Sequence, residues 1–281
     1  MRTSLREGGV NVATIDTDRE LPGVPIYECP EALTDTPLRY CPGCTHGIAH
    51  RLVAETIDEL GVRDRTIAVA SVGCSVYAYE YFNTDSVQAA HGRAPAVATG
   101  IKRVRPDAVV FTYQGDGDLA AIGLGEVLQA ATRAENITVI FINNGVFGMT
   151  RGQMAPTTLL GQKTTTTPAG RSVAEAGFPL DVCRILDQID GVAYLSRETA
   201  IDPKHVMRAR RAVEKAFQAQ LDGLGFSLVE ILSTCPHCWH MSPMEAMEHV
   251  RTEVIARYPL QVFRDPYAAK PATDSGASGT E

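Results

Sequence analysis

Two pairs of closely spaced cysteines are the most reactive feature of the sequence. Cys41 and Cys44 enclose Pro-Gly, Cys235 and Cys238 enclose Pro-His, and each pair makes a compact two-thiolate clamp. Cys74 adds a fifth thiol at the end of an apolar run. Four thiolates can hold a zinc ion or an iron–sulfur cluster. Because the two pairs lie far apart, unlike the ligands of a zinc ribbon, a cluster held by the first pair, Cys74 and one thiol of the second pair fits at least as well as zinc.

A second candidate site combines an aspartate and an asparagine that each follow an apolar run. Asp116 stands in the motif Gly-Asp-Gly-Asp, and Asn144, which ends the motif Asn-Asn, lies 28 positions later. That spacing is about the length of a helix followed by a parallel strand, which would bring both side chains to the same edge of a sheet. Mg²⁺ prefers oxygen ligands, so Asp116, Asn144 and a carbonyl just after Asn144 would suit it. Gly115 and Gly117 would let the backbone approach a diphosphate, whose charge the N-terminus of the next helix favours.

Short β-branched runs alternate with amphipathic segments along the chain, which is typical of an α/β fold with a mainly parallel sheet and helices on both faces. We predict strands at 66–72, 108–113, 137–143, 192–195 and 226–232, and helices at 46–60 and 243–258. Ligands of such folds bind beyond the carboxyl ends of the strands. We therefore expect both candidate sites at one edge of the sheet.

The composition is that of an ordinary globular protein, with 281 residues of which 44% are hydrophobic. Residues 1–38 are predicted to be an N-terminal arm and 264–281 a flexible tail, because both are polar and lack periodicity, which leaves 39–263 as the α/β domain. The net charge of -7 and the lack of a dense basic run argue against nucleic-acid binding.

The chain is expected to be cytoplasmic, because no apolar stretch approaches the ~20 residues of a membrane span and the N-terminus has no apolar signal core. In that compartment its seven cysteines are more often ligands, redox groups or buried residues than disulfides. Cys29 and Cys183 have no partner at a short spacing, and we expect them to be buried or loop cysteines.

In content and order, the motifs between about residues 38 and 252 resemble the β subunits of the 2-oxoacid:ferredoxin oxidoreductases. These motifs are CPGC-x-HG, SVGC, HGR, GDGD, NN-x-VFGMT-x-GQ-x-x-PTT, and STCP followed by a helix. The resemblance implies the thiamine-diphosphate-binding fold, with half of a thiamine diphosphate site, Mg²⁺ and one [4Fe-4S] cluster in this chain. Two departures are Thr45, where the family commonly has glycine, and Cys238-Trp239-His240, where it often has Asn-Trp-Gly.

The same resemblance implies roles for individual residues. It assigns Mg²⁺ to Asp116, Asn144 and the carbonyl of Val146. It assigns the cluster to Cys41, Cys44, Cys74 and Cys235, with Cys238 as an extra thiol, although the second departure leaves the choice between Cys235 and Cys238 open. Further positions expected at the thiamine diphosphate are Thr45, His46, Gly73, His91, Gly115, Gly117, Asp118, Gly148, Met149 and Thr150.

The implied reaction is the oxidative decarboxylation of a 2-oxoacid with coenzyme A to acyl-CoA and CO2, with electrons passed to ferredoxin, and the reverse carboxylation in principle. In the family a partner α subunit supplies the glutamate that activates the aminopyrimidine and most of the coenzyme A contact, so we expect αβ pairs in an α2β2 assembly. Arg151 lies where similar enzymes acting on 2-oxoglutarate often have lysine, and its guanidinium suits a distal carboxylate. We therefore favour 2-oxoglutarate as the substrate.

Several alternatives remain open at this point. Pyruvate or a branched-chain 2-oxoacid is an alternative substrate. A non-redox thiamine-dependent decarboxylase subunit would keep Asp116 and Asn144 but would not need the thiolates. A zinc-stapled, non-catalytic assembly subunit would keep the thiolates but would not need the spacing from Gly-Asp-Gly to Asn-Asn.

Overall fold

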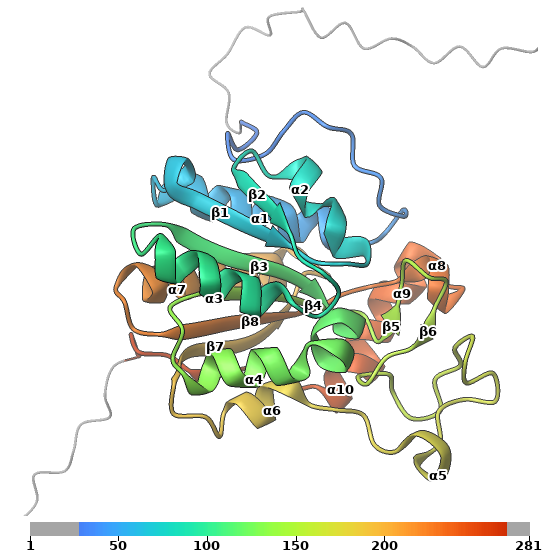
Figure 1. Cartoon of the computed structure of the whole chain (residues 1–281). Helices are drawn as coiled ribbons and strands as arrows, with labels where there is room; N and C mark the ends of the chain where they lie inside the picture. The colour runs from blue at the N-terminus through green and yellow to red at the C-terminus, as the bar shows by residue number, and fades with distance from the viewer. Residues whose placement is uncertain (1–27, 269–281) are drawn as a thin grey trace, which may run out of the picture.

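The computed structural model describes residues 28–268, which form a seven-stranded sheet in the order β2-β1-β3-β4-β8-β7-β9 (Figure 1). Neighbouring strands are parallel, except that β9 runs antiparallel to β7. The strands are β1 (Thr66–Ala70), β2 (Asp85–Gln88), β3 (Val109–Gly115), β4 (Thr138–Asn143), β7 (Val192–Thr199), β8 (Phe226–Leu232) and β9 (Gln261–Arg264). A separate antiparallel pair, β5 (Val146–Phe147) and β6 (Gln153–Met154), lies beyond the end of β4.

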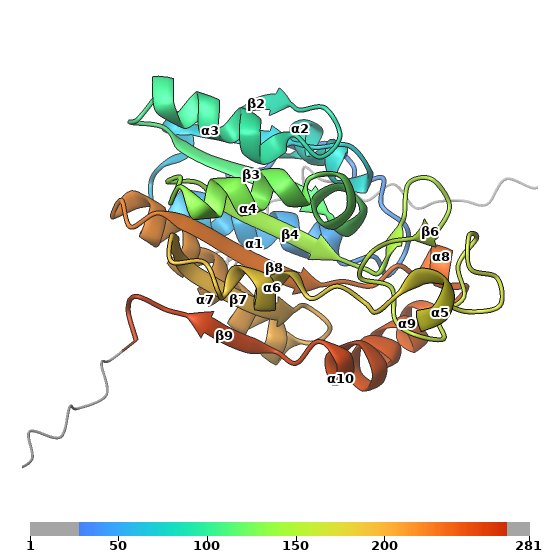
Figure 2. The ribbon, with the colours of Figure 1, turned by 60° about the horizontal axis from the view of Figure 1, so that its bottom comes forward.

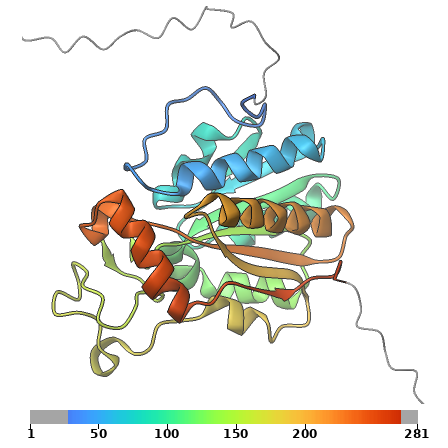
Figure 3. The same cartoon turned by 180° about the vertical axis from the view of Figure 1, so that it is seen from behind.

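Helices cover both faces of the sheet, because its central strands are apolar on both sides. On one face α1 (His46–Glu59) and α7 (Pro203–Leu221) pack together, as Figure 3 shows from behind. On the other face lie α3 (Ala94–Val104), α4 (Leu124–Thr132) and α6 (Val182–Leu186) (Figure 2). Each face of the sheet has its own hydrophobic core. Along β3, Phe111 packs into the core under α1 and α7 and Val110 into the core under α3, α4 and α6, as expected for side chains that alternate across a strand.

The remaining helical segments are short and lie mostly at the carboxyl edge of the sheet. They are the 3-10 turns η1 (Arg63–Arg65) and η2 (Cys74–Tyr77), the π-helical turns η3 (Gly117–Ile122) and η4 (Val250–Val254), and the helices α2 (Ala78–Tyr81), α5 (Val173–Ala176), α8 (Pro236–Trp239), α9 (Pro243–His249) and α10 (Ile255–Arg257).

The α/β fold predicted from the sequence is confirmed, with a strand in each of the five predicted segments. The predicted helix 46–60 is α1, whereas the predicted helix 243–258 is α9, η4 and α10 in succession. The edge strands β2 and β9 were not predicted, since their residues, which are exposed in β2 and exposed or half-buried in β9, carry no apolar pattern.

Both predicted extensions lie partly outside the described residues. In the arm, residues 28–38 are described, and the buried Ala32 donates its N–H to the Asp58 carboxylate at 3.1 Å. In the tail, 264–268 are described, and Asp265 pairs with Lys215 at 2.6 Å. The domain limits themselves remain a prediction. Within 28–268 no helix has the length and hydrophobicity to cross a membrane.

Candidate functional site

A cavity lies beyond the carboxyl ends of β1, β3 and β4, where the chain leaves the sheet. It gathers every position expected at the thiamine diphosphate except Thr45. Its lining residues are His46, Val72, Gly73, Cys74, Ser75, His91, Gly115, Asp116, Gly117, Asp118, Asn144, Val146, Phe147, Gly148, Met149 and Thr150. Thr45 is buried beside the cavity, with its hydroxyl 2.6 Å from that of Ser233.

Asp116 is held at the end of β3, where it caps the π-helical turn η3. Its carboxylate accepts hydrogen bonds from the Gly117 N–H and the Thr157 hydroxyl, both at 2.8 Å. Only 2% of the residue is exposed, and this burial raises the pKa of Asp116 to about 7, although the two hydrogen bonds oppose the shift. A side chain at position 117 would lie 2.4 Å from the Phe147 ring, so the close approach requires glycine there.

Asp118, two residues later, is also buried, and both of its carboxylate oxygens have hydrogen-bond partners within the chain. One oxygen accepts from the Gly92 N–H at 2.6 Å and contacts His91 Nδ1, and the other accepts from Gln114 Nε2 at 2.6 Å. Asp118 therefore ties the loop that carries His91 to the end of β3. Gly92 has φ +77°, and a β-carbon there would lie 2.7 Å from the Gly123 nitrogen.

The turn after β4 brings a second set of oxygens to the cavity. The Asn144 side-chain oxygen accepts from the Val146 N–H at 3.1 Å, and Gly145 between them has φ +71°. The Trp239 indole donates to the Asn144 carbonyl at 3.1 Å. Asp116 and Asn144 both line the cavity, and one carboxylate with neutral oxygens is a donor set that suits Mg²⁺. A bound cation would also reverse the effect of burial on the Asp116 carboxylate.

The cysteine loops meet beside this cavity. The carbonyl of Gly43, between Cys41 and Cys44, accepts a hydrogen bond from the Thr234 hydroxyl at 2.6 Å, which joins the first cysteine pair to the segment before Cys235. A β-carbon at Gly148 would lie 3.3 Å from the Cys74 sulfur and 3.6 Å from that of Cys235. These two thiols therefore flank a residue that lines the cavity.

The thiols also affect one another electrostatically. Burial raises the pKa of Cys44 to about 11 and that of Cys74 to about 12, and neighbouring thiolates, including Cys41 for both, add to the shifts. A hydrogen bond between the second pair raises the pKa of Cys235 and lowers that of Cys238 to about 7. Within the described residues, no three His, Cys, Asp or Glu side chains are arranged to hold a single metal ion.

The other sequence candidates lie outside the cavity lining. Arg151 is exposed, follows the lining residue Thr150 and has φ +77°. Cys29 is exposed in a loop, whereas Cys183 is buried and donates to the Glu230 carboxylate at 3.0 Å.

Sequence reasoning missed an aromatic cluster that joins the cavity to the cysteine loops. Tyr40 stacks on His46 with ring centroids 4.6 Å apart, and its hydroxyl lies 2.7 Å from His50 Nε2 and 3.2 Å from the Cys74 carbonyl. His46 is hydrogen-bonded to Tyr113 at 2.8 Å, and burial lowers the pKa of His46 to about 4. The sequence did contain one signal for this cluster: His46 and His50 are four residues apart, which places both on one face of a helix.

The chain is similar to known proteins in sequence and in structure. Residues 67–231 match the family described as thiamine pyrophosphate enzyme, C-terminal TPP binding domain. Ketoisovalerate oxidoreductase subunit VorA of Methanothermobacter thermautotrophicus is 48% identical over 240 residues, which cover 85% of this chain and 50% of that protein. The chain thus spans about half the length of this relative.

Two further proteins are similar over most of both chains. 2-Oxoglutarate synthase subunit KorB of Archaeoglobus fulgidus is 35% identical over 215 residues, 76% of each chain. A solved structure of 2-oxoglutarate:ferredoxin oxidoreductase from Magnetococcus marinus, with 2-oxoglutarate, coenzyme A and succinyl-CoA bound, has a TM-score of 0.73 and 25% identity, covering 88% of this chain and 87% of that one. With its thiamine pyrophosphate-binding domain, the chain belongs to the 2-oxoacid:ferredoxin oxidoreductase family.

Proposed function

We propose that the chain is the thiamine diphosphate-binding β subunit of a 2-oxoacid:ferredoxin oxidoreductase. The complete enzyme would convert a 2-oxoacid and coenzyme A to acyl-CoA and CO2 and reduce ferredoxin through a [4Fe-4S] cluster. The observation that carries the proposal is the position of Gly148, which lines the cavity and is flanked by the Cys74 and Cys235 sulfurs. A non-redox decarboxylase would not need thiols there, and a zinc-stapled assembly subunit would not need the cavity.

In this proposal Asp116, Asn144 and the Val146 carbonyl hold Mg²⁺, which in turn binds the diphosphate. The absence of a side chain at Gly117 lets the Phe147 ring pack against the backbone beside Asp116, and Asp118 holds His91 in the cavity lining. When bound, thiamine diphosphate supplies the carbanion chemistry, while the chain orients it and limits access of water.

The proposed cluster ligands are Cys41, Cys44, Cys74 and Cys235. A [4Fe-4S] cluster takes four thiolates spread around four irons, so they need not converge on one point as ligands of a single ion do. Cys238 is left as the extra thiol, because its sulfur is hydrogen-bonded to the Gly148 carbonyl at 3.4 Å, and a β-carbon at Gly152 would lie 3.5 Å from it. The seven cysteines are all free of disulfides, which suits the proposed cytoplasmic location.

The proposed assembly is an α2β2 complex in which the α subunit covers the aminopyrimidine of the cofactor and binds most of the coenzyme A. The chain purified without oxygen is expected to be brown, with iron and acid-labile sulfide, and to reduce ferredoxin with a 2-oxoacid and coenzyme A only after the α subunit is added. Colourless protein that contains zinc, or full activity of the chain by itself, would contradict the proposal.

Two substrates are candidates. Arg151 favours 2-oxoglutarate, because a carboxylate buried at the far end of the substrate needs a cation. Ketoisovalerate is favoured by the higher identity to VorA, 48% against 35% for KorB. It is also favoured by the cavity, which contains Phe147 and Met149 but no lysine or arginine from the described part of the chain.

Replacement of Arg151 by methionine distinguishes these substrates. If 2-oxoglutarate is the substrate and the α subunit covers Arg151 in the assembled enzyme, kcat/KM for it should fall about 100-fold or more, because breaking a charge pair that has become buried costs about 3–5 kcal/mol. The value for ketoisovalerate should change little, and Arg151→Lys should retain part of the activity. A wild-type preference for ketoisovalerate, together with equal losses on both substrates in Arg151→Met, would assign Arg151 a structural role.

A further inference from the structure

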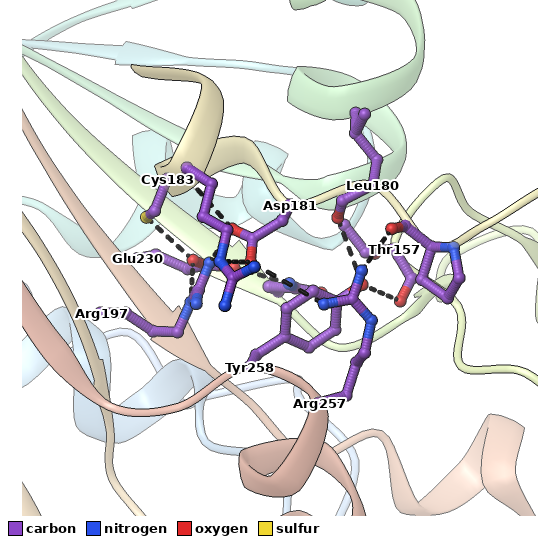
Figure 4. Close-up of polar contacts among 11 residues, drawn as sticks. Thr157, Leu180, Asp181, Cys183, Arg197, Glu230, Arg257 and Tyr258 are labelled. Atoms are coloured by element: carbon purple, nitrogen blue, oxygen red, sulfur yellow. Dashed lines mark hydrogen bonds and ion pairs between the residues drawn. The ribbon is translucent and has the colours of Figure 1, made fainter. Parts of the chain in front are cut away.

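A buried ionic network lies between the strands and the C-terminal helices, outside the cavity (Figure 4). Arg197 of β7, only 1% exposed, donates to the Glu230 carboxylate of β8 at 2.6 Å and pairs with Asp181. The Tyr258 ring lies 5.2 Å from the guanidinium carbon. Replacing such a network by apolar residues of similar volume is often neutral or stabilising, so stability alone is a weak reason for its presence.

One branch of the network reaches the turn after β4. The second oxygen of Glu230 accepts from the Asn143 side-chain nitrogen at 2.7 Å. The Asn143 side-chain oxygen in turn accepts from the Gly145 N–H at 3.2 Å. Gly145 lies between the two proposed metal ligands Asn144 and Val146, so Glu230 fixes their turn through Asn143.

A second branch reaches the other half of the metal site. The Tyr258 hydroxyl donates to the Thr157 carbonyl at 2.8 Å, with the Leu180 carbonyl at 3.2 Å (Figure 4). The Thr157 hydroxyl donates to the Asp116 carboxylate at 2.8 Å. The same buried network therefore contacts the residues that orient Asp116 and those that orient Asn144.

We propose that Asn143, Thr157 and Tyr258 are positioning residues, anchored by the network of Asp181, Arg197 and Glu230, that set the relative geometry of the metal ligands after β3 and β4. The inference rests on the proposed function, because it requires Mg²⁺ at this site. Mg²⁺ demands nearly octahedral geometry and gives up water reluctantly, so its ligands must be held in place before it binds. Partners of metal ligands typically change metal affinity about 10- to 100-fold when they are lost.

The test is the Mg²⁺ concentration that gives half-maximal rebinding of thiamine diphosphate to the assembled oxidoreductase after treatment with EDTA. Tyr258→Phe keeps the ring beside Arg197 and removes only the hydroxyl, and Thr157→Val removes only the donor to Asp116. Each is expected to raise that concentration about 10-fold or more. Thr157→Ser, which keeps the hydroxyl, should restore the wild-type value.

Cys183→Ala is the matched control. It removes a buried hydrogen bond to the Glu230 oxygen that also accepts from Arg197, and leaves the other Glu230 oxygen, which accepts from Asn143, unchanged. It should lower Tm without changing the Mg²⁺ dependence. If Tyr258→Phe and Thr157→Val also lower only Tm, the network is structural and the inference is overturned. If the wild-type enzyme does not bind thiamine diphosphate with Mg²⁺ at all, the proposed function itself fails.

Discussion

Replacement of Asp116 by alanine is expected to abolish Mg²⁺-dependent retention of thiamine diphosphate while the chain still folds. Asp116 supplies the only charge among the proposed metal ligands, since Asn144 and the Val146 carbonyl are neutral. The fold should tolerate the change, because burial raises the pKa of Asp116 and therefore disfavours its charged form when no cation is bound. The measurements are thiamine diphosphate and magnesium per protein, together with Tm of the cofactor-free form.

Two related variants make this result interpretable. Asp116→Asn keeps an oxygen ligand without the charge and should bind the cofactor only at higher Mg²⁺ concentrations. Asp118→Ala should instead lower Tm, because Asp118 accepts from the Gly92 N–H and Gln114 Nε2 and holds His91. Wild-type cofactor occupancy in Asp116→Ala would show that Asp116 is not a metal ligand.

The centre of the sheet was predictable from the sequence for a physical reason. Strands β3, β4 and β8 are covered on both faces, so most of their residues are apolar or β-branched and the runs stand out. The four residues of β2 are all exposed at the edge of the sheet, so burial does not require them to be apolar and they form no recognisable run. Its pairing with β1 becomes visible only when the chain is folded.

In the candidate site, too, some residues could be predicted from the sequence and others could not. Asp116 and Asn144 directly follow strands, so the rule that ligands bind beyond strand ends was enough to place them together. Thr157 and Tyr258 come from a long loop and from the residue after α10, and nothing in their spacing relates them to Asp116. Contacts of this kind arise from packing between distant segments, for which a single sequence carries no local pattern.

The cysteines offer the second large effect. Serine at any of Cys41, Cys44, Cys74 or Cys235 is expected to remove the [4Fe-4S] cluster, whereas Cys238→Ser should keep it. Within the second pair, we favour Cys235 because a β-carbon at Gly148 would lie between its sulfur and that of Cys74, whereas the Cys238 thiol is hydrogen-bonded to the Gly148 carbonyl. Iron, acid-labile sulfide and the electron paramagnetic resonance spectrum of the reduced protein, prepared without oxygen, are the measurements.

Cys29→Ser is the control for loss of a thiol as such, since Cys29 is exposed in a loop and should leave the iron content unchanged. In the cluster-free form, the hydrogen bond between Cys235 and Cys238 lowers the pKa of Cys238, so this thiol should react fastest with an alkylating reagent near neutral pH. Because Cys238 is not a proposed ligand, its alkylation should still allow the cluster to be rebuilt. Loss of the cluster in Cys238→Ser, with survival in Cys235→Ser, would instead make Cys238 the fourth ligand and Cys235 the extra thiol.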